Sequence, residues 1–146
     1  MHSRRIKNNW HIIKGQPLTE LDKKVLYYQN KGHLVPSRKL IKTAEQVEGI
    51  RRSSVVNTGV LDLVAREIKA GMSTAEIDKL VYDYTVSHGA IPAPLNYEGF
   101  PKSVCTSVNE VVCHGVPNEK VILKKGDIVN LDITVIKDGY HGDTSR

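Results

Sequence analysis

The sequence predicts a mixed α/β (α+β) fold in which helices cover an antiparallel sheet. Two stretches begin with a capping-box pattern and continue with apolar residues at helical spacing. Short segments rich in β-branched residues occupy the second half of the chain. The longest of these segments leads into an Asp-Gly dipeptide, which favours a two-residue β-hairpin because both central positions need a positive φ.

The first predicted helix begins after Thr43 and ends before Gly71. Thr43 and Gln46 form the capping-box pattern at its start. A stripe of residues then steps by three or four positions along one face, as expected for a helix that covers a core. The stripe comprises Val47, Ile50, Ser54, Asn57, Leu61, Val64 and Ile68.

The second predicted helix begins after Ser73, where Ser73 and Glu76 repeat the capping-box pattern. Gly89 suits the position after its last turn, where a positive φ is common. The apolar face comprises Ile77, Leu80, Val81 and Tyr84. Both helices need a sheet to cover, and the strand candidates are residues 102–105, 111–114, 127–136 and 140–143.

The hairpin around Asp138 and Gly139 is the most informative part of the sequence. Counting outward from the turn pairs Lys137 with Tyr140, Ile136 with His141, Val135 with Gly142, Thr134 with Asp143, Ile133 with Thr144, and Asp132 with Ser145. One face then carries Asp132, Thr134, Asp143 and Ser145, with Ile136 and His141 nearer the turn, and the other carries Leu131, Ile133 and Val135.

Asp132 and Asp143 lie diagonally on one face of this hairpin, where Cβ atoms are about 7 Å apart. Two carboxylates directed at one point repel each other, and a hard divalent cation relieves the repulsion because such ions prefer oxygen ligands. Bridging carboxylates can hold two ions about 3.5–4 Å apart. The hairpin therefore predicts a metal site. The alternative is that both Asp side chains are solvated surface residues.

The composition is that of a globular protein, with 40% hydrophobic and 25% charged residues among 146. The sequence contains no stretch that resembles a membrane span or a secretory leader, so we expect a soluble cytoplasmic protein. Cys105 and Cys113 have neither CxxC spacing nor a secretory context. We therefore expect reduced thiols rather than a disulfide or a structural zinc site.

Positive charge is concentrated in residues 1–40, which we expect to form a basic amino-terminal extension. This segment has a net charge of +7, from nine Lys and Arg against two acids, whereas residues 41–146 have −2, from twelve against fourteen. The extension can contact ribosomal RNA phosphates. Alternatively, it forms a partly helical arm that packs on the body through Trp10, Ile12, Ile13, Val25 and Leu26. The arm is favoured because the sequence contains no RNA-binding motif.

Two segments carry a family resemblance. Residues 96–118 read NYEGFPKSVCTSVNEVVCHGVPN and residues 126–145 read GDIVNLDITVIKDGYHGDTS, and the similarity extends back to IKTAEQVEGIR from residue 41. The chain resembles the type I methionine aminopeptidases. The resemblance implies the two-halved pita-bread fold, with residues 41–146 as a truncated amino-terminal half. It also implies removal of the initiator Met from nascent proteins whose second residue is small.

The resemblance further implies a cofactor and individual site residues. Asp132 and Asp143 match two of the family's five metal ligands, which hold two divalent ions of Co, Mn, Fe or Zn. The remaining ligands, a His and two Glu, belong to the second half, so residues 1–146 alone are expected to be inactive. His114 matches a catalytic His that hydrogen-bonds the substrate, whereas His141 matches no ligand. The pocket for the Met side chain is matched by Tyr97, Phe100 and Cys105, with Pro94 where some relatives have Cys. A monovalent-cation site is matched by the backbone oxygens of Asn109 and Val111. Thr134 is expected to support Asp143.

The implied partners are nascent polypeptide amino termini, with ribosome contact through the basic extension, no membrane, and a monomeric complete enzyme. Three alternatives remain. The first is a prolidase-type metallopeptidase, which would share the two Asp. The second is a non-catalytic pita-bread module that would act in a ribosome or chromatin assembly. The third is a basic RNA-binding protein, which would use the extension. For His114, Tyr97 and Phe100 the alternative is a structural role in a loop or core.

Overall fold

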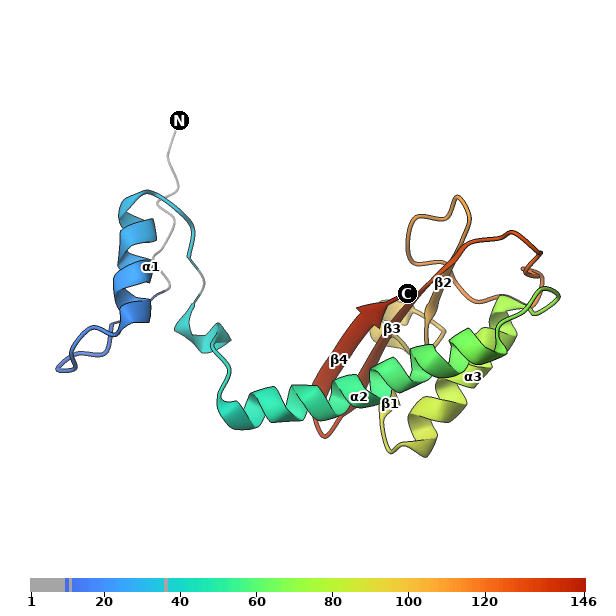
Figure 1. The fold of residues 1–146 in the computed structure, drawn as a ribbon, viewed down its shortest axis with the longest axis horizontal. Coiled ribbons are helices and arrows are strands. Elements are labelled where there is room, and N and C mark those ends of the chain that lie inside the picture. The colour runs from blue at the N-terminus through green and yellow to red at the C-terminus, as the bar shows by residue number, and fades with distance from the viewer. Residues whose placement is uncertain (1–9, 11, 36) are drawn as a thin grey trace. The chain divides into compact units, whose positions relative to one another are not determined.

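The structure, a computed structural model, describes residues 10, 12–35 and 37–146 (Figure 1). Residues 1–9, 11 and 36 of the predicted basic extension therefore lie outside the described residues. The chain forms two units, Met1–Thr43 and Ala44–Arg146. Each unit has its own buried side chains.

The first unit contains helix α1 (Glu20–Asn30) and a short 3-10 turn, η1 (Arg38–Leu40). Thr19 caps α1 through a capping box. The Asp22 N–H donates to Thr19 Oγ1 (3.1 Å), and the Thr19 N–H donates to the Asp22 carboxylate (3.0 Å). This cap explains why a segment with only modest helical periodicity forms a helix.

The first unit closes around the carboxylate of Asp22, a residue that is 4% exposed. Trp10 Nε1 donates to Asp22 Oδ1 (3.0 Å), and Arg38 forms an ion pair with the same oxygen. The Arg38 guanidinium also lies over the Trp10 ring, 4.6 Å from its centroid. The Asp22 carboxylate thus joins Trp10, α1 and η1.

The apolar residues through which the arm is predicted to pack on the body divide into two groups by exposure. Trp10 and Val25 are buried and Leu26 is half-buried. Ile12 and Ile13 are 41% and 49% exposed, and packing of the arm on the body stays a prediction. They lie in an irregular segment before α1, outside the helix face that buries Val25.

The second unit begins with two helices, α2 (Ala44–Glu67) and α3 (Thr74–Ser87). The predicted capping box of Ser73 and Glu76 is present on α3, and Gly89 adopts φ 64° just after it. Helix α2 ends before the predicted stripe does. Its buried residues are Gly49, Ser53, Val56, Asn57, Val60, Leu61 and Val64.

The predicted stripe of α2 is wrong in its first half. Val47 is 43% exposed, and Ile50 and Ser54 are only half-buried. The face that meets the sheet carries Gly49 and Ser53 instead. Small residues are needed there because the last strand, which carries Tyr140 and Gly142, approaches this part of α2 closely. A pattern of apolar residues does not include Gly and Ser, so it misses this face.

The sheet of the second unit is antiparallel and centred on β3 (Val129–Lys137). Strand β2 (Cys105–Val108) pairs with the first part of β3, β1 (Ile91–Pro92) pairs with its second part, and β4 (Tyr140–Ser145) pairs along residues 132–137. A 3-10 turn, η2 (Tyr97–Gly99), lies between β1 and β2.

Two strand predictions differ from the structure. Residues 111–114 form no strand, because Asn109 and His114 adopt positive φ values of 51° and 56° that interrupt an extended path. Val112 consequently stands 90% exposed. The strand expected at 102–105 begins only at Cys105, where β3 offers a pairing partner.

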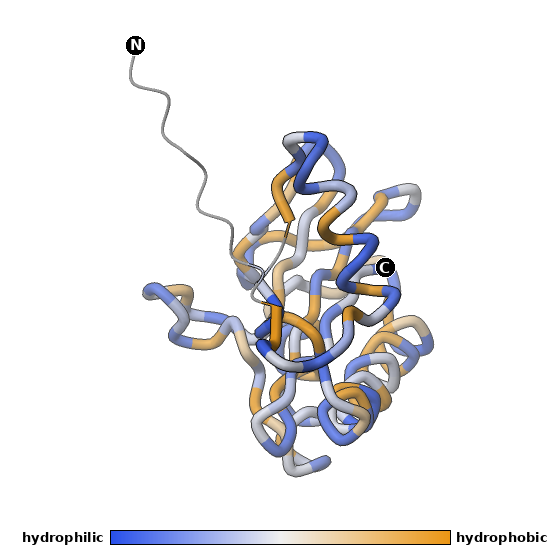
Figure 2. Tube along the Cα trace, turned by 90° about the vertical axis from the view of Figure 1, so that its left-hand side faces the viewer, coloured by the Kyte–Doolittle hydropathy of each residue, from blue (hydrophilic) through white to orange (hydrophobic). Residues whose placement is uncertain are grey.

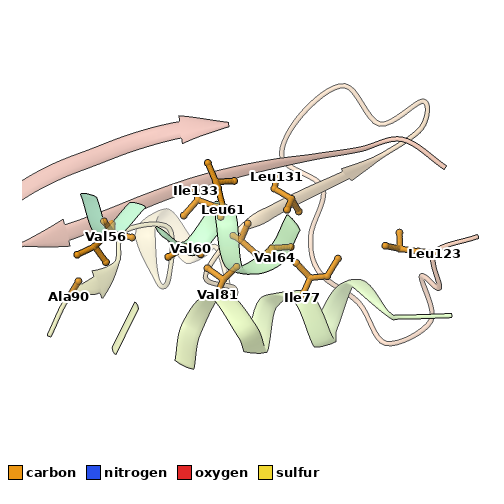
Figure 3. Close-up of a cluster of buried hydrophobic side chains, with 12 residues drawn as sticks. Val56, Val60, Leu61, Val64, Ile77, Val81, Ala90, Leu123, Leu131 and Ile133 are labelled. Atoms are coloured by element: carbon orange, nitrogen blue, oxygen red, sulfur yellow. The ribbon is translucent and has the colours of Figure 1, made fainter. Parts of the chain in front are cut away.

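The core of the second unit lies between the two helices and the sheet (Figure 3). Side chains of α2 and α3 meet the predicted apolar face of the hairpin, which is buried as expected. Burying one such aliphatic side chain contributes about 1.5–3 kcal/mol. The cluster comprises Val56, Val60, Leu61, Val64, Ile77, Val81, Ala90, Val104, Leu123, Leu131, Ile133 and Val135.

Hydrophobic and hydrophilic residues alternate over short stretches along the chain (Figure 2). Within the part of the chain that the structure describes, no helix combines the length and the apolar character that a membrane span requires.

Candidate metal and substrate site

The β3–β4 hairpin places the two predicted metal ligands on one face. Asp138 and Gly139 form its turn with φ values of 52° and 80°. All six residue pairs predicted by counting outward from this turn are present, from Lys137 with Tyr140 to Asp132 with Ser145. The register is therefore confirmed, and Asp143 lies opposite Thr134 on the same face as Asp132.

Helix α2 holds this hairpin through close contacts. A Cβ on Gly142 would lie 2.7 Å from the Ser53 backbone carbonyl carbon, so strand and helix approach almost to backbone contact. Ser53 Oγ also donates to the Val135 carbonyl (3.1 Å). Arg146 adds an ion pair to α2 just beyond the strand (2.9 Å). These contacts fix the backbone beside Asp143.

Among the residues that the structure describes, no Lys or Arg balances the charge of the two carboxylates on this face. Asp132 is half-buried and Asp143 is exposed, and in the described part of the chain neither forms an ion pair with Lys or Arg. Thr134 Oγ1 donates to Asp143 Oδ1 (2.9 Å), which orients that carboxylate. Two carboxylates on one face, without Lys or Arg partners in the described part of the chain, form a suitable donor set for a hard divalent cation.

A cavity of about 800 Å³ lies beside Asp132. Its walls come from the loop between β1 and β2, from β2 itself, from the loop that follows β2, and from β3 and β4. Six predicted site residues line it, namely Tyr97, Phe100, Cys105, His114, Asp132 and Thr134, and Pro94 and His141 do so too. The remaining predicted residues, Asp143, Asn109 and Val111, are not part of the lining.

Several lining residues have no counterpart in the sequence prediction. Ala93, Glu98, Gly99, Pro101 and Val116 belong to this group. Most of them lie in the loop that also carries Tyr97 and Phe100. Only their proximity in sequence to these two aromatic residues could have indicated that they line the cavity. Asn96 and Glu98 have φ values of 67° and 48°, and no periodic pattern predicts such a path.

Cys105 lies opposite Asp132 in the β2–β3 pairing and forms part of the cavity wall. Burial raises the pKa of the Cys105 thiol, and the nearby charges of Asp132 and Cys113 raise this pKa further. The thiol is therefore protonated near neutral pH and presents a soft, uncharged surface to the cavity.

Asn109 is held in a separate network. Its side chain donates to Asp127 Oδ1 (2.9 Å) and accepts from the Ile128 N–H (3.1 Å). The hydrogen bond from Asn109 lowers the pKa of Asp127, with a further contribution from the Lys124 N–H. The Val111 N–H donates to the Val108 carbonyl (3.1 Å). These bonds give residues 108–111 a defined backbone path outside the cavity.

Comparison with known proteins identifies the family. The sequence model of the protein family described as metallopeptidase family M24 matches residues 48–146. The chain belongs to metallopeptidase family M24. The first unit lies before this match.

The M24 relatives include methionine aminopeptidases. The chain is 51% identical over 107 residues to the methionine aminopeptidase of Escherichia coli (strain K12), covering 73% of this chain and 40% of that protein. It is 50% identical over 102 residues to methionine aminopeptidase 1 of Saccharomyces cerevisiae, covering 70% and 26%. The crystal structure of methionine aminopeptidase from Rickettsia prowazekii matches with a TM-score of 0.71 and 50% identity, covering 73% and 42%.

These comparisons confirm the resemblance to methionine aminopeptidases and the expected pita-bread fold, of which this chain represents a part. The chain spans about two fifths of the Escherichia coli relative. An M24 metallopeptidase uses a divalent metal, and the oxygen donors of Asp132 and Asp143 fit one. Within the described ranges, no group of three or more His, Cys, Asp and Glu side chains could hold a metal ion.

Proposed function

We propose that this chain supplies the amino-terminal half of a methionine aminopeptidase, formed by residues 41–146 and preceded by a basic extension of residues 1–40. The observation that supports this most directly is the cavity that joins an aromatic and thiol wall to His114 and Asp132. The second argument is that relatives with 51% and 50% sequence identity are named methionine aminopeptidases. In the complete protein, the activity would be removal of the initiator Met from nascent proteins.

In this proposal Asp132 and Asp143 hold the metal through their carboxylate oxygens, and Thr134 orients Asp143 through its hydroxyl. A divalent metal bound there supplies Lewis-acid polarisation of the scissile carbonyl and a more acidic bound water. Two ions of Co, Mn, Fe or Zn are proposed, because carboxylate oxygens accept each of these metals. The residues that complete the ligand set would come from the part of the relatives that this chain does not span.

The substrate is proposed to enter the cavity with its Met side chain first. Tyr97, Phe100 and Cys105 would contact the thioether, which packs well against aromatic rings and soft sulfur. His114 would act as the catalytic residue that hydrogen-bonds the peptide group near the scissile bond. A neutral imidazole suits this role because it carries one donor and one acceptor.

The remaining roles follow from the same proposal. Backbone oxygens of Asn109 and Val111 would bind a monovalent cation. The protein would act in the cytoplasm as a monomer, on nascent chains that begin with Met and a small residue. The +7 charge of residues 1–40 supports contact with ribosomal RNA phosphates.

The test measures Met release from the peptide Met-Ala-Ser, with added Mn or Co, by a protein that extends this chain to the length of its relatives. Asp132→Asn is expected to lower kcat/KM by about a hundredfold or more, since it removes a charged metal donor. Asp138→Asn makes the same chemical change at the hairpin turn, where Asn readily adopts the φ of 52°. This control should keep its activity.

Other results would contradict the proposal in different ways. Cleavage of Xaa-Pro dipeptides without Met release would indicate a prolidase-type enzyme. No hydrolysis of either substrate by the extended protein would indicate a non-catalytic binding module. An equal loss in Asp132→Asn and Asp138→Asn would show that the effect is not specific to the proposed metal face.

A further inference from the structure

His114 belongs to an exposed loop, yet its backbone is held in an uncommon conformation. Its φ of 56° lies in the left-handed region, which few residues other than Gly adopt. The residue lines the cavity together with Cys105 and Asp132. A non-Gly residue keeps such a conformation only where the surrounding contacts determine it.

Strand β2 supplies these contacts through two consecutive residues. The Thr106 N–H donates to the Gly115 carbonyl (2.7 Å), and the Gly115 N–H donates to Ser107 Oγ (3.3 Å). The second bond holds the peptide group that joins His114 to Gly115. Ser107 is 3% exposed, so bulk water does not readily replace its hydroxyl as the acceptor.

Gly115 lies too close to β2 to carry any side chain. A Cβ at this position would overlap the Thr106 carbonyl group and would lie 3.0 Å from Ser107 Cα. The loop can therefore rest directly on the strand whose first residue, Cys105, forms the cavity wall. This close contact brings His114 to the edge of the same wall.

We propose that Ser107 is a positioning residue for His114. Its hydroxyl fixes the peptide group after His114 and so directs the imidazole into the cavity. Ser107 is not among the residues that line the cavity, and its effect passes through Gly115. The inference rests on the proposed function for the task of His114, but the position of the imidazole can be measured in the 146-residue chain without any activity.

The experiment is NMR spectroscopy of the isotopically labelled chain and three variants. In Ser107→Ala, the Gly115 amide is expected to exchange about tenfold faster or more, because its acceptor is lost. The side-chain resonances of His114 should shift, because the peptide group that follows His114 is no longer held by the hydroxyl of residue 107. Ser107→Thr keeps the hydroxyl and should restore both signals.

Thr106→Val is the matched control. It replaces the neighbouring buried hydroxyl, which has no hydrogen-bond partner among the described residues, by a methyl group of similar size. The backbone bond from Thr106 to Gly115 is unaffected by this change. Gly115 exchange and the His114 side-chain resonances should therefore stay as in the unsubstituted chain.

A folded Ser107→Ala chain in which the His114 side-chain resonances do not shift would overturn the inference, as would an equal change in Thr106→Val. If Ser107→Ala does not fold, Ser107→Thr decides the question. Unchanged Gly115 exchange in that variant supports the inference, and fast exchange in a folded Ser107→Thr chain overturns it. A failed peptidase assay would count against the proposed function and would leave these NMR results intact.

Discussion

Cys105 and Cys113 differ in environment although both are free thiols. Cys113 is exposed, whereas Cys105 is 9% exposed and has a pKa raised by burial and by the charge of Asp132. The thiolate is the reactive form of cysteine. The difference in alkylation rate between Cys105 and Cys113 therefore measures how burial and charge at the cavity wall affect the Cys105 thiol.

Cys113 is expected to react with iodoacetamide much faster than Cys105 at pH 8 in metal-free buffer. Asp132→Asn should accelerate alkylation of Cys105, because removing the negative charge lowers its pKa and increases the thiolate fraction. Mass spectrometry of the two cysteine peptides over time measures both rates. Equal rates for Cys105 in the two proteins would contradict an electrostatic effect of Asp132.

At the scale of elements, the hairpin depends on its contact with α2. Replacing Gly142 by Ala would place a methyl group 2.7 Å from the Ser53 backbone, and neither backbone segment can move away without losing its own hydrogen bonds. We expect Gly142→Ala to lower the free energy of unfolding by about 1–3 kcal/mol. Urea denaturation followed by far-UV circular dichroism measures this change.

Ser145→Ala, at an exposed position of the same strand, serves as the control for this measurement. It should change the free energy of unfolding by no more than about 0.5 kcal/mol. If Gly142→Ala proved as mild as Ser145→Ala, β4 and α2 would be less closely packed than the contact between Gly142 and Ser53 indicates.

Helix α1 is expected to depend on pH through Asp22. The hydrogen bonds from Thr19, together with Trp10 and Arg38, lower the pKa of Asp22 from 3.8 to about 2. A lowered folded-state pKa stabilises the first unit above pH 3.8, and this contribution is lost as the pH falls through about 2. Trp10 is the only Trp of the chain, so its fluorescence reports on this unit alone.

Acidification from pH 5 to about pH 2 should therefore shift the Trp10 emission to longer wavelength as the ring becomes exposed. Asp22→Asn should show the longer wavelength already at neutral pH and should lose most of the pH dependence. An emission maximum that does not move between pH 5 and 2 in the unsubstituted chain would rule out this role of the carboxylate.

For the molecule as a whole, the 146-residue chain is expected to release no Met from Met-Ala-Ser, even with Mn or Co in excess. Its proposed metal face offers two carboxylates, and a two-metal hydrolytic site needs more ligands to fix both ions. Calorimetry should detect only weak Mn binding, lost in Asp132→Asn. Met release above the metal-only background would show that the chain is catalytically sufficient.

Much of the second unit could be predicted from the sequence because its signals are local. The Asp138-Gly139 turn determines the register of every pair in the hairpin, since a two-residue loop leaves no freedom in counting. The Ser73 capping box likewise marks the start of α3. Asp132 and Asp143 could therefore be assigned to one face from the sequence alone.

Other features escaped prediction because they depend on contacts between distant segments. Val111 and Val112 read as a strand, but the positive φ of His114 and the packing of Gly115 on β2 are decided by tertiary contact. The buried face of α2 was misjudged because Gly49 is buried for its small size rather than its hydrophobicity. On the loop between β1 and β2, the cavity lining could be predicted only where the family resemblance named residues such as Tyr97.

The near-contact of Gly142 with Ser53 also limits how this protein can be altered. The two positions are 89 apart in the sequence (142 − 53), yet they are coupled, because a side chain at position 142 would meet the Ser53 backbone and the Ser53 hydroxyl is itself buried against the Val135 carbonyl of the same hairpin. A library that varies α2 for stability should keep small side chains at Ser53 and vary the solvent-facing positions freely. A larger side chain at Ser53 would displace the hairpin that carries Asp143. The resulting loss of activity would be mistaken for the loss of a metal ligand.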